Sequence, residues 1–163
     1  MNKTVITTDQ NKLIVKRKFD APLSLVWKAW TEDELLDQWW APKPWKSKTT
    51  HMDFNEGGYR MYAMVGPEGE VHWGRSDYQT INELKSFSGE DSFCDEEGNI
   101  VESLPIAHFS NEFSEKSGQT AVTIITMYES REYLEQVIEM GIKEGFTAAC
   151  ENLDEVLKKV NPK

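Results

Sequence analysis

The sequence predicts an α+β fold in which a curved antiparallel sheet of about six to seven strands wraps around one long C-terminal helix, with two short helices between the first and second strands. Between Trp45 and Tyr128, short extended segments alternate with turn signals that lie too close together for crossover helices. These strands must therefore pair mainly antiparallel. From Ser130 onward, apolar residues recur every three or four positions over about eight helical turns. Such a helix buries its apolar stripe against the concave face of a sheet.

The size and charge of the chain limit the classes of protein to consider. A length of 163 residues predicts one domain, residues 1–163, with a core from about residue 12 to residue 160. The net charge of −10 opposes binding to nucleic acid and to anionic membrane surfaces. The apolar runs are too short for insertion into a membrane. We therefore expect neither nucleic acid nor a bilayer as a partner.

The N-terminus and the cysteines bear on the compartment. No apolar stretch of the length found in signal peptides follows Lys3, so a cytoplasmic location is expected. Cys94 and Cys150 are far apart in the sequence and lack the spacing of metal ligands. We interpret both as reduced, mainly structural thiols and expect no metal site.

Residues 12–19 form the first expected strand, because branched and aromatic side chains are frequent there. The basic run from Lys16 to Lys18 indicates a sheet edge or a solvent face. Pro22 suits the first turn of a short helix that ends near Thr31. Thr31 and Glu34 have the spacing of a capping box, which predicts a second helix over residues 32–40.

The later elements follow from turn signals and periodicity. Ser130 has a side chain that suits the N-cap of the long helix. Gly141 and Gly145 lie one turn apart on its apolar stripe, where each glycine costs about 1 kcal/mol relative to alanine. Either the helix packs tightly on the sheet there or a ligand uses the space, and Gly145→Leu is expected to be harmful in both cases. The strands expected between the turns are residues 45–54, 59–65, 71–83, 85–93, 107–115 and 120–128.

Short motifs occur along almost the whole chain, from Lys12 to Leu157, in an order typical of one family. They are Asp20-Ala21-Pro22, Val26-Trp27, Trp30-Thr31, Leu36, Trp39-Trp40, Asp53-Phe54, Gly57-Gly58, Gly66-Pro67-Glu68-Gly69, Gly74, Phe93, Asp95-Glu96-Glu97-Gly98-Asn99, Thr120-x-Val122-Thr123, Met140-Gly141, Glu144-Gly145-Phe146 and Leu153. This order resembles the START-like helix-grip superfamily (SRPBCC), and within it the Aha-type family named for the activator of heat-shock protein 90 ATPase. Two positions depart from the family pattern: Phe146 replaces a more frequent tryptophan, and Arg60 replaces an aromatic residue.

The resemblance implies a cavity between the sheet and the long helix. The wider superfamily uses this cavity for lipids, sterols, polyketides and other apolar ligands, and sometimes for catalysis. Its members share no catalytic motif, so no catalytic residue is carried over and no cofactor is expected. The residues predicted to line the cavity are Trp39, Trp45, Phe54, Arg60, Tyr62, Met64, Trp73, Tyr78, Phe93, Phe109, Phe113, Ile138, Gly141, Ile142, Gly145, Phe146 and Ala149.

Three groups of cavity candidates each have a second interpretation. Five of the six tryptophans lie between residues 27 and 45, where they either fill the core or act as a ligand gate, for which Trp39 and Trp45 are the best candidates. The register implied by the resemblance turns Arg60 inward, where it either anchors a ligand acid or carbonyl or pairs with Glu112 or Asp77. In residues 71–81, a period of two does not decide which parity faces the cavity.

The remaining polar residues give weak signals. None of the three histidines (His51, His72, His108) has a partner fixed by its spacing. The sequence contains no nucleophile elbow, phosphate-binding glycine loop or zinc-protease motif. The acidic residues Glu90, Asp91, Asp95, Glu96, Glu97 and Glu102 lack calcium-loop spacing, which indicates a solvated hairpin tip.

Three functions remain open. The first is a protein that binds a small hydrophobic or aromatic molecule in the cavity. The second is a cyclase- or hydratase-type enzyme in the same cavity, which a cavity residue with a strongly perturbed pKa would favour. The third, suggested by the family name, is a chaperone-linked interaction module, which requires a surface patch and would be tested by co-purification with a heat-shock ATPase.

Overall fold

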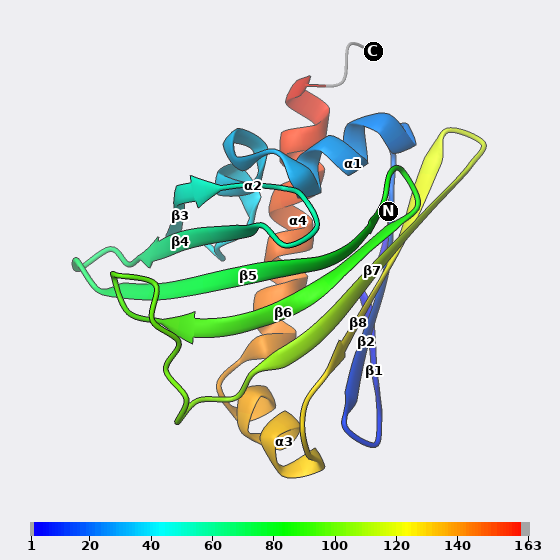
Figure 1. The fold of residues 1–163 in the computed structure, drawn as a ribbon. Helices are drawn as coiled ribbons and strands as arrows, with labels where there is room; N and C mark the ends of the chain where they lie inside the picture. The colour runs from blue at the N-terminus through cyan, green and yellow to red at the C-terminus, as the bar shows by residue number, and fades with distance from the viewer. Residues whose placement is uncertain (1, 161–163) are drawn as a thin grey trace.

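The computed structural model describes residues 2–160. Within this range, one antiparallel sheet of eight strands curves around the C-terminal helix, in the order β1-β2-β8-β7-β6-β5-β4-β3 (Figure 1). The strands are β1 Val5–Asp9, β2 Lys12–Phe19, β3 Lys46–Met52, β4 Tyr59–Val65, β5 Val71–Asn82, β6 Ser86–Cys94, β7 Ala107–Lys116 and β8 Gln119–Met127. The helices are α1 Leu23–Thr31, α2 Asp33–Trp39, α3 Arg131–Glu139 and α4 Ile142–Val160. The predicted α+β helix-grip architecture is confirmed.

The sheet has one strand more than predicted. β1 is mostly exposed, and its two apolar residues, Val5 and Ile6, are adjacent and do not alternate, so it is placed by its pairing with β2. β2 therefore lies between β1 and β8, and the predicted sheet edge at residues 12–19 is wrong. Lys16 and Lys18 do face solvent, whereas Arg17 between them is buried.

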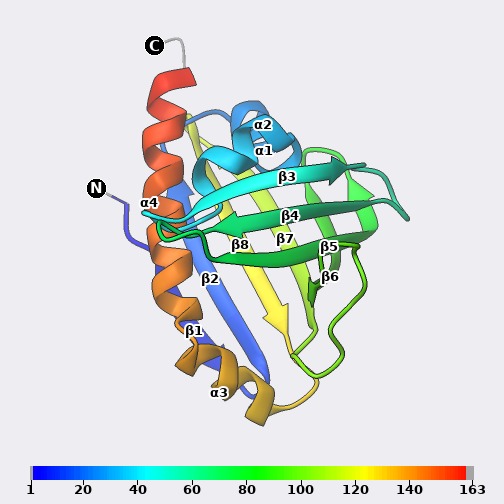
Figure 2. The same ribbon diagram turned by 90° about the vertical axis from the view of Figure 1, so that its left-hand side faces the viewer.

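The two short helices between β2 and β3 are confirmed, but the predicted capping box is wrong. The N-cap of α2 is Glu32, which makes no side-chain capping bond. Thr31 instead donates its hydroxyl hydrogen bond to the carbonyl of Trp27, one turn earlier in α1. In Figure 2, both helices lie across one end of the curved sheet, beside the C-terminal part of α4.

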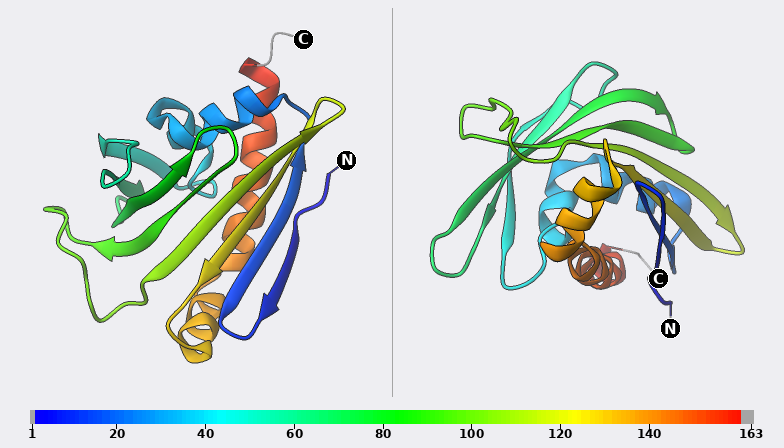
Figure 3. Two further views of the ribbon diagram at one scale, coloured as in Figure 1. Left: turned by 45° about the vertical axis from the view of Figure 1, so that its right-hand side comes forward. Right: turned by 90° about the horizontal axis from the view of Figure 1, so that it is seen from below.

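The C-terminal helix is not continuous, contrary to prediction. Ser130 does cap its start, because its Oγ accepts a hydrogen bond from the backbone N–H of Tyr133 at 3.2 Å. Gly141 then has a φ of +98°, a conformation that glycine adopts without steric cost. The chain changes direction there, so α3 lies across the end of α4 and below the sheet (Figure 3).

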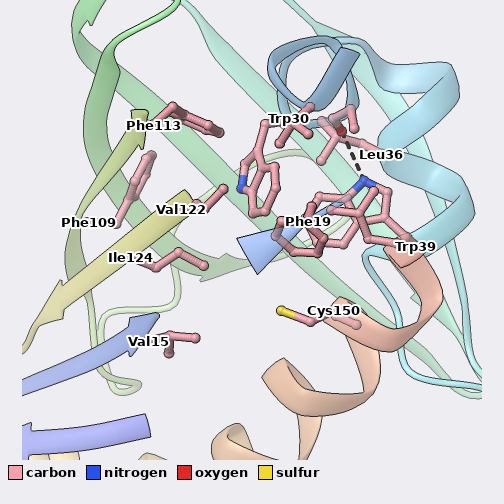
Figure 4. Close-up of a cluster of buried hydrophobic side chains, with 14 of the residues drawn as sticks. Val15, Phe19, Trp30, Leu36, Trp39, Phe109, Phe113, Val122, Ile124 and Cys150 are labelled. Atoms are coloured by element: carbon pink, nitrogen blue, oxygen red, sulfur yellow. Dashed lines mark hydrogen bonds between the residues drawn. The ribbon is translucent and has the colours of Figure 1, made fainter. Parts of the chain in front are cut away.

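The hydrophobic core is richest in aromatic side chains where α1 and α2 meet the sheet. The rings of Trp30 and Trp39 lie 4.7 Å apart, and Trp30 also contacts Phe113 edge-on at 5.4 Å. Trp39 donates its indole N–H to the carbonyl of Ala29 at 2.9 Å, the bond drawn in Figure 4. These edge-to-face contacts fix the two helices on the sheet.

A partly buried ion pair joins α4 to β2. The guanidinium of Arg17 is 3% exposed and binds the carboxylate of Asp154, and it also donates to Thr4 and to the carbonyl of Lys18.

Among residues 2–160, no helix has both the length and the apolar character to cross a bilayer.

Asp154→Ala is expected to lower the free energy of unfolding by about 1–2 kcal/mol, because the buried guanidinium of Arg17 loses its counterion but keeps two neutral acceptors. Urea denaturation measures the change. The control is Glu155→Ala on the same helix, since Glu155 pairs at 2.9 Å with Lys43 where both side chains are mostly exposed. This control is expected to leave the midpoint unchanged; equal shifts in the two variants would contradict the expectation.

Candidate ligand cavity

A cavity of about 480 Å³ lies between α4 and the concave face of the sheet. Its volume is within the range of cavities that hold small organic ligands. The walls are largely apolar and rich in aromatic rings: tryptophans come from α1, α2, the segment before β3 and β5, and phenylalanines come from β6, β7 and α4.

The structure brings fourteen of the seventeen predicted residues around this cavity and places three elsewhere. Those that line it are Trp39, Trp45, Arg60, Tyr62, Met64, Trp73, Tyr78, Phe93, Phe109, Gly141, Ile142, Gly145, Phe146 and Ala149. Phe54 and Phe113 instead pack edge-on against Trp27 of α1, with ring centroids 6.1 and 5.1 Å from its ring. The side chain of Trp27 fills the space at their end of the sheet. Ile138 belongs to α3 and packs against the core.

The glycines of the C-terminal region do not make the tight contact that one interpretation required. A Cβ added at Gly145 would meet no described atom within 4 Å, and Gly145 lines the cavity. The interpretation of close helix-on-sheet packing is therefore wrong at this position, and the harm expected of Gly145→Leu stays a prediction that follows from the ligand interpretation alone. Gly141 is explained by the break between α3 and α4.

The two tryptophans predicted as gates occupy different places. Trp39 is 2% exposed and is fixed by its bond to Ala29, so it forms a rigid wall. Trp45 is half-buried, and its ring centroid lies 5.3 Å from that of the exposed His72, at the rim of the cavity. Met140, which is 57% exposed, also lines the cavity and marks its rim near the break in the helix.

A row of polar side chains crosses the largely apolar concave face. Arg60 on β4 is directly opposite Ser76 on β5, and Ser76 is directly opposite Asp91 on β6. Adjacent strands lie about 4.8 Å apart, so this polar row spans about 10 Å. It also resolves the parity of β5, because Ser76 and Tyr78 are buried and line the cavity.

The guanidinium of Arg60, 2% exposed, is held by groups from two other elements. Nη2 donates to Asp37 of α2 at 3.2 Å and to Ser47 of β3 at 3.0 Å, and Nε donates to Thr49 of β3 at 3.1 Å. The ring centroid of Tyr62 lies 4.2 Å from Cζ of Arg60, a favourable cation–π distance. The positive charge of Arg60 is thus compensated by Asp37 of α2, which does not belong to the polar row.

The partners predicted for Arg60 are wrong. Asp77 lies on the opposite face of β5, where it forms an ion pair with Arg75 at 2.6 Å. Glu112 is exposed on β7. The acidic partner comes from α2, because the chain between α2 and β3 is short enough to bring Asp37 beside the start of the sheet.

Asp91 contradicts the prediction of a solvated hairpin tip. It lies within β6 and faces the cavity, where the hydroxyl of Ser76 donates to its Oδ1 at 2.5 Å. Desolvation raises the pKa of Asp91 to about 6, although the bond from Ser76 and the charge of Arg60 both act to lower it. Its shared parity with Phe87 and Phe93 was the sequence signal that could have placed it inside.

Other polar groups of the cavity remain neutral. Burial raises the pKa of Tyr62 to about 12 and also raises the pKa values of Tyr78 and Tyr128. Asn111, which the sequence analysis missed, is 6% exposed, and its Oδ1 has no hydrogen-bond partner among the described residues. An unpaired amide oxygen in a buried site is costly unless a ligand or water satisfies it.

The histidines and cysteines lie outside this polar row. His51 stacks on Tyr59 at 4.2 Å, and Nδ1 of His108 lies 3.7 Å from a carboxylate oxygen of Glu90. Both cysteines are free and buried. Within residues 2–160, no three His, Cys, Asp or Glu side chains are grouped as metal ligands.

The curved sheet, the long helix across its concave face and the cavity between them define a START-like helix-grip protein. A family model described as "Activator of Hsp90 ATPase homolog 1-like protein" matches residues 20–158. The chain therefore belongs to this family.

Solved bacterial structures are similar over nearly the whole chain. Protein Ms6760 from Mycobacterium smegmatis is 31% identical, with a TM-score of 0.87, over 94% of this chain and 96% of its own. A protein from Arthrobacter aurescens is 30% identical, with a TM-score of 0.90, over 96% and 92% of the two chains. A protein from Staphylococcus epidermidis is 26% identical, with a TM-score of 0.85, over 95% of this chain and 94% of its own. A comparison with curated proteins gives no match.

Proposed function

We propose that this protein binds a small apolar or aromatic molecule in the cavity between α4 and the sheet. The observation that carries the proposal is a cavity of about 480 Å³ with largely apolar, aromatic-rich walls and a row of polar groups. Ligand sites in proteins typically combine such apolar walls with a few placed polar groups. The open space beside Gly145 supports the same function, since a structural role alone would favour a larger side chain there.

Native mass spectrometry of the protein purified from its host tests the proposal directly. We expect a discrete mass difference between the native protein and the denatured chain, corresponding to the bound molecule. The spectrum would also give the mass of the ligand and hence its chemical class. A native mass equal to that of the chain, together with no binding of added aromatic compounds, would contradict the proposal.

Gly145→Phe is expected to reduce ligand occupancy at least about tenfold, because its ring would enter open space within the cavity. Occupancy is read from the same native spectra. The matched control is Gly145→Ala, which adds one methyl group and should retain the ligand. The control should also raise the free energy of unfolding by up to about 1 kcal/mol, through its better helix propensity. An adduct that persists in Gly145→Phe would show that the ligand lies elsewhere.

Catalysis in the same cavity is the second candidate function, and the environment of Asp91 favours it. A carboxyl group whose pKa is raised to about 6 can both donate and accept a proton near neutral pH. A cyclase- or hydratase-type reaction needs such a group beside an apolar substrate. Incubation of the purified protein with the compound found by native mass spectrometry would reveal turnover as a change in the compound's mass or chromatographic retention.

The family description includes an Hsp90 activator, so a chaperone partner is a further proposal. Co-purification with a heat-shock ATPase from the host would support it. Retention of the ATPase by the Gly145→Phe variant would separate such a surface interaction from ligand binding.

A further inference from the structure

We infer that the cavity selects a neutral ligand whose polar end donates a hydrogen bond to Asp91, such as a hydroxyl or an N–H group on an apolar body, and that it discriminates against the corresponding carboxylate. This inference rests on the proposed function and specifies its ligand class. It follows from how the charges of the polar row are compensated.

The positive charge of the row is already neutralised. Arg60 uses Nε and Nη2 for Asp37, Ser47 and Thr49, so a full counterion and two hydroxyl groups surround it. Its Nη1 makes no hydrogen bond to the described residues, which leaves room for a neutral acceptor such as a carbonyl. A second anion is not required to balance the guanidinium.

The negative charge at the other end of the row is not neutralised in the same way. Asp91 receives one hydrogen bond, from Ser76, and no ion pair to it is formed within residues 2–160. The ion-paired acid of this region, Asp37, binds Arg60 beside the edge strand β3, at the end of the polar row away from Asp91 on β6. A ligand carboxylate in the cavity would therefore face Asp91 in a medium that screens charge poorly.

Two buried polar atoms of cavity-lining residues, Oδ1 of Asn111 and Oγ of Ser92, also lack a hydrogen-bond partner among the described residues. Oδ1 of Asn111 is buried without a partner, and Asn111 lines the cavity from β7. The register places Asn111 opposite Phe87, four residues along β6 from Asp91. The Asn111 amide and the Ser92 hydroxyl can each donate as well as accept, so the preference for a ligand that supplies an N–H or O–H group rests on Asp91.

The test uses three probes with one apolar body: 2-naphthalenemethanol, 2-naphthoate and 2-methylnaphthalene. Isothermal titration calorimetry at about pH 7.5, where both Asp91 and naphthoate are ionised, gives their affinities. We expect the alcohol to bind at least about tenfold more tightly than the carboxylate and several-fold more tightly than the hydrocarbon. Asp91→Asn, which keeps an acceptor and removes the charge, is expected to strengthen naphthoate binding and to change alcohol binding little.

Asp91→Leu removes the acceptor and is expected to cancel the preference for the alcohol over the hydrocarbon. The control is Glu90→Gln on the same strand, since Glu90 lies on the opposite face and pairs with His108. It should leave all three affinities unchanged, and thermal unfolding checks that each variant is folded.

The outcomes separate this inference from the proposed function. Tighter binding of naphthoate than of the alcohol, or equal binding of the alcohol and the hydrocarbon, would overturn the selection by Asp91 while leaving the cavity as a ligand site. Failure of all three probes to bind, with no adduct in native spectra, would overturn both the selection and the proposed function.

Discussion

Replacing Asp37 with alanine is expected to lower the free energy of unfolding by about 3 kcal/mol, because it leaves the guanidinium of Arg60 buried without a counterion. Asp37 accepts hydrogen bonds from Ser47, from Arg60 and from both the backbone and the side chain of Thr49. One carboxylate therefore joins α2 to β3 and β4. Equilibrium unfolding in urea, monitored by tryptophan fluorescence, measures the loss.

A double-mutant cycle separates the loss of the counterion from a general loss of packing. When Arg60→Leu is combined with Asp37→Ala, the buried charge is removed, so the double variant should be less destabilised than the sum of the two single variants. Asp37→Asn keeps an acceptor for the two β3 residues and should fall between the wild type and Asp37→Ala. Strict additivity would contradict the assigned role of the ion pair.

Replacing Asp91 with asparagine is expected to stabilise the protein at neutral pH by up to about 3 kcal/mol. The pKa of Asp91 is raised from 3.8 to about 6 in the folded protein, so the folded state binds its proton more tightly than the unfolded state does. Ionisation of Asp91 consequently destabilises the fold progressively as the pH rises from about 4 to about 6, and a shift of one pKa unit corresponds to about 1.4 kcal/mol. The asparagine variant avoids this loss.

The measurement is the free energy of unfolding of wild type and Asp91→Asn at pH values below 4 and above 6. The difference between them should be small at the lower pH and largest at the higher pH. The charged and titratable groups that act on Asp91 are Arg60 and Asp77, and Tyr62, Tyr78 and Tyr128 lie in the same electrostatic environment. Glu90→Gln should show no such pH-dependent difference; the same stability gain at both pH values would contradict the assignment.

The sequence predicts most of the fold because local signals mark most of the elements. Glycine-containing turns separate β3 from β4, β4 from β5, β6 from β7 and β7 from β8, and α1 follows from Pro22 and the spacing of tryptophans. The second short helix was predicted from a capping box that the structure does not form. β1 was missed because its apolar residues, Val5 and Ile6, are adjacent rather than alternating, and its place depends on hydrogen bonds to β2. The break in the C-terminal helix was missed because Gly141 fits the apolar periodicity although it adopts a positive φ.

The site is only partly predictable for a different reason. The inward position of Arg60 follows from the strand period together with the resemblance, but its partner Asp37 comes from another element and carries no spacing signal. Asp91 was hidden among neighbouring acidic residues, and its environment depends on where β6 ends. Phe113 has the parity of the cavity residue Phe109 and Phe54 follows the end of β3, yet Trp27 occupies the space in front of both rings.

The sheet does not close on itself, since β1 and β3 are its two free edges and α4 covers the concave side between them. The sheet wall of the cavity is thus held together by hydrogen bonds between strands, whereas the α4 wall is held against the sheet by side-chain contacts. Ile142, Phe146 and Ala149 of α4 line the cavity without taking part in any strand pairing. The shape of the binding site can therefore diverge between relatives through substitutions on one helix, while the strand register that maintains the fold stays the same.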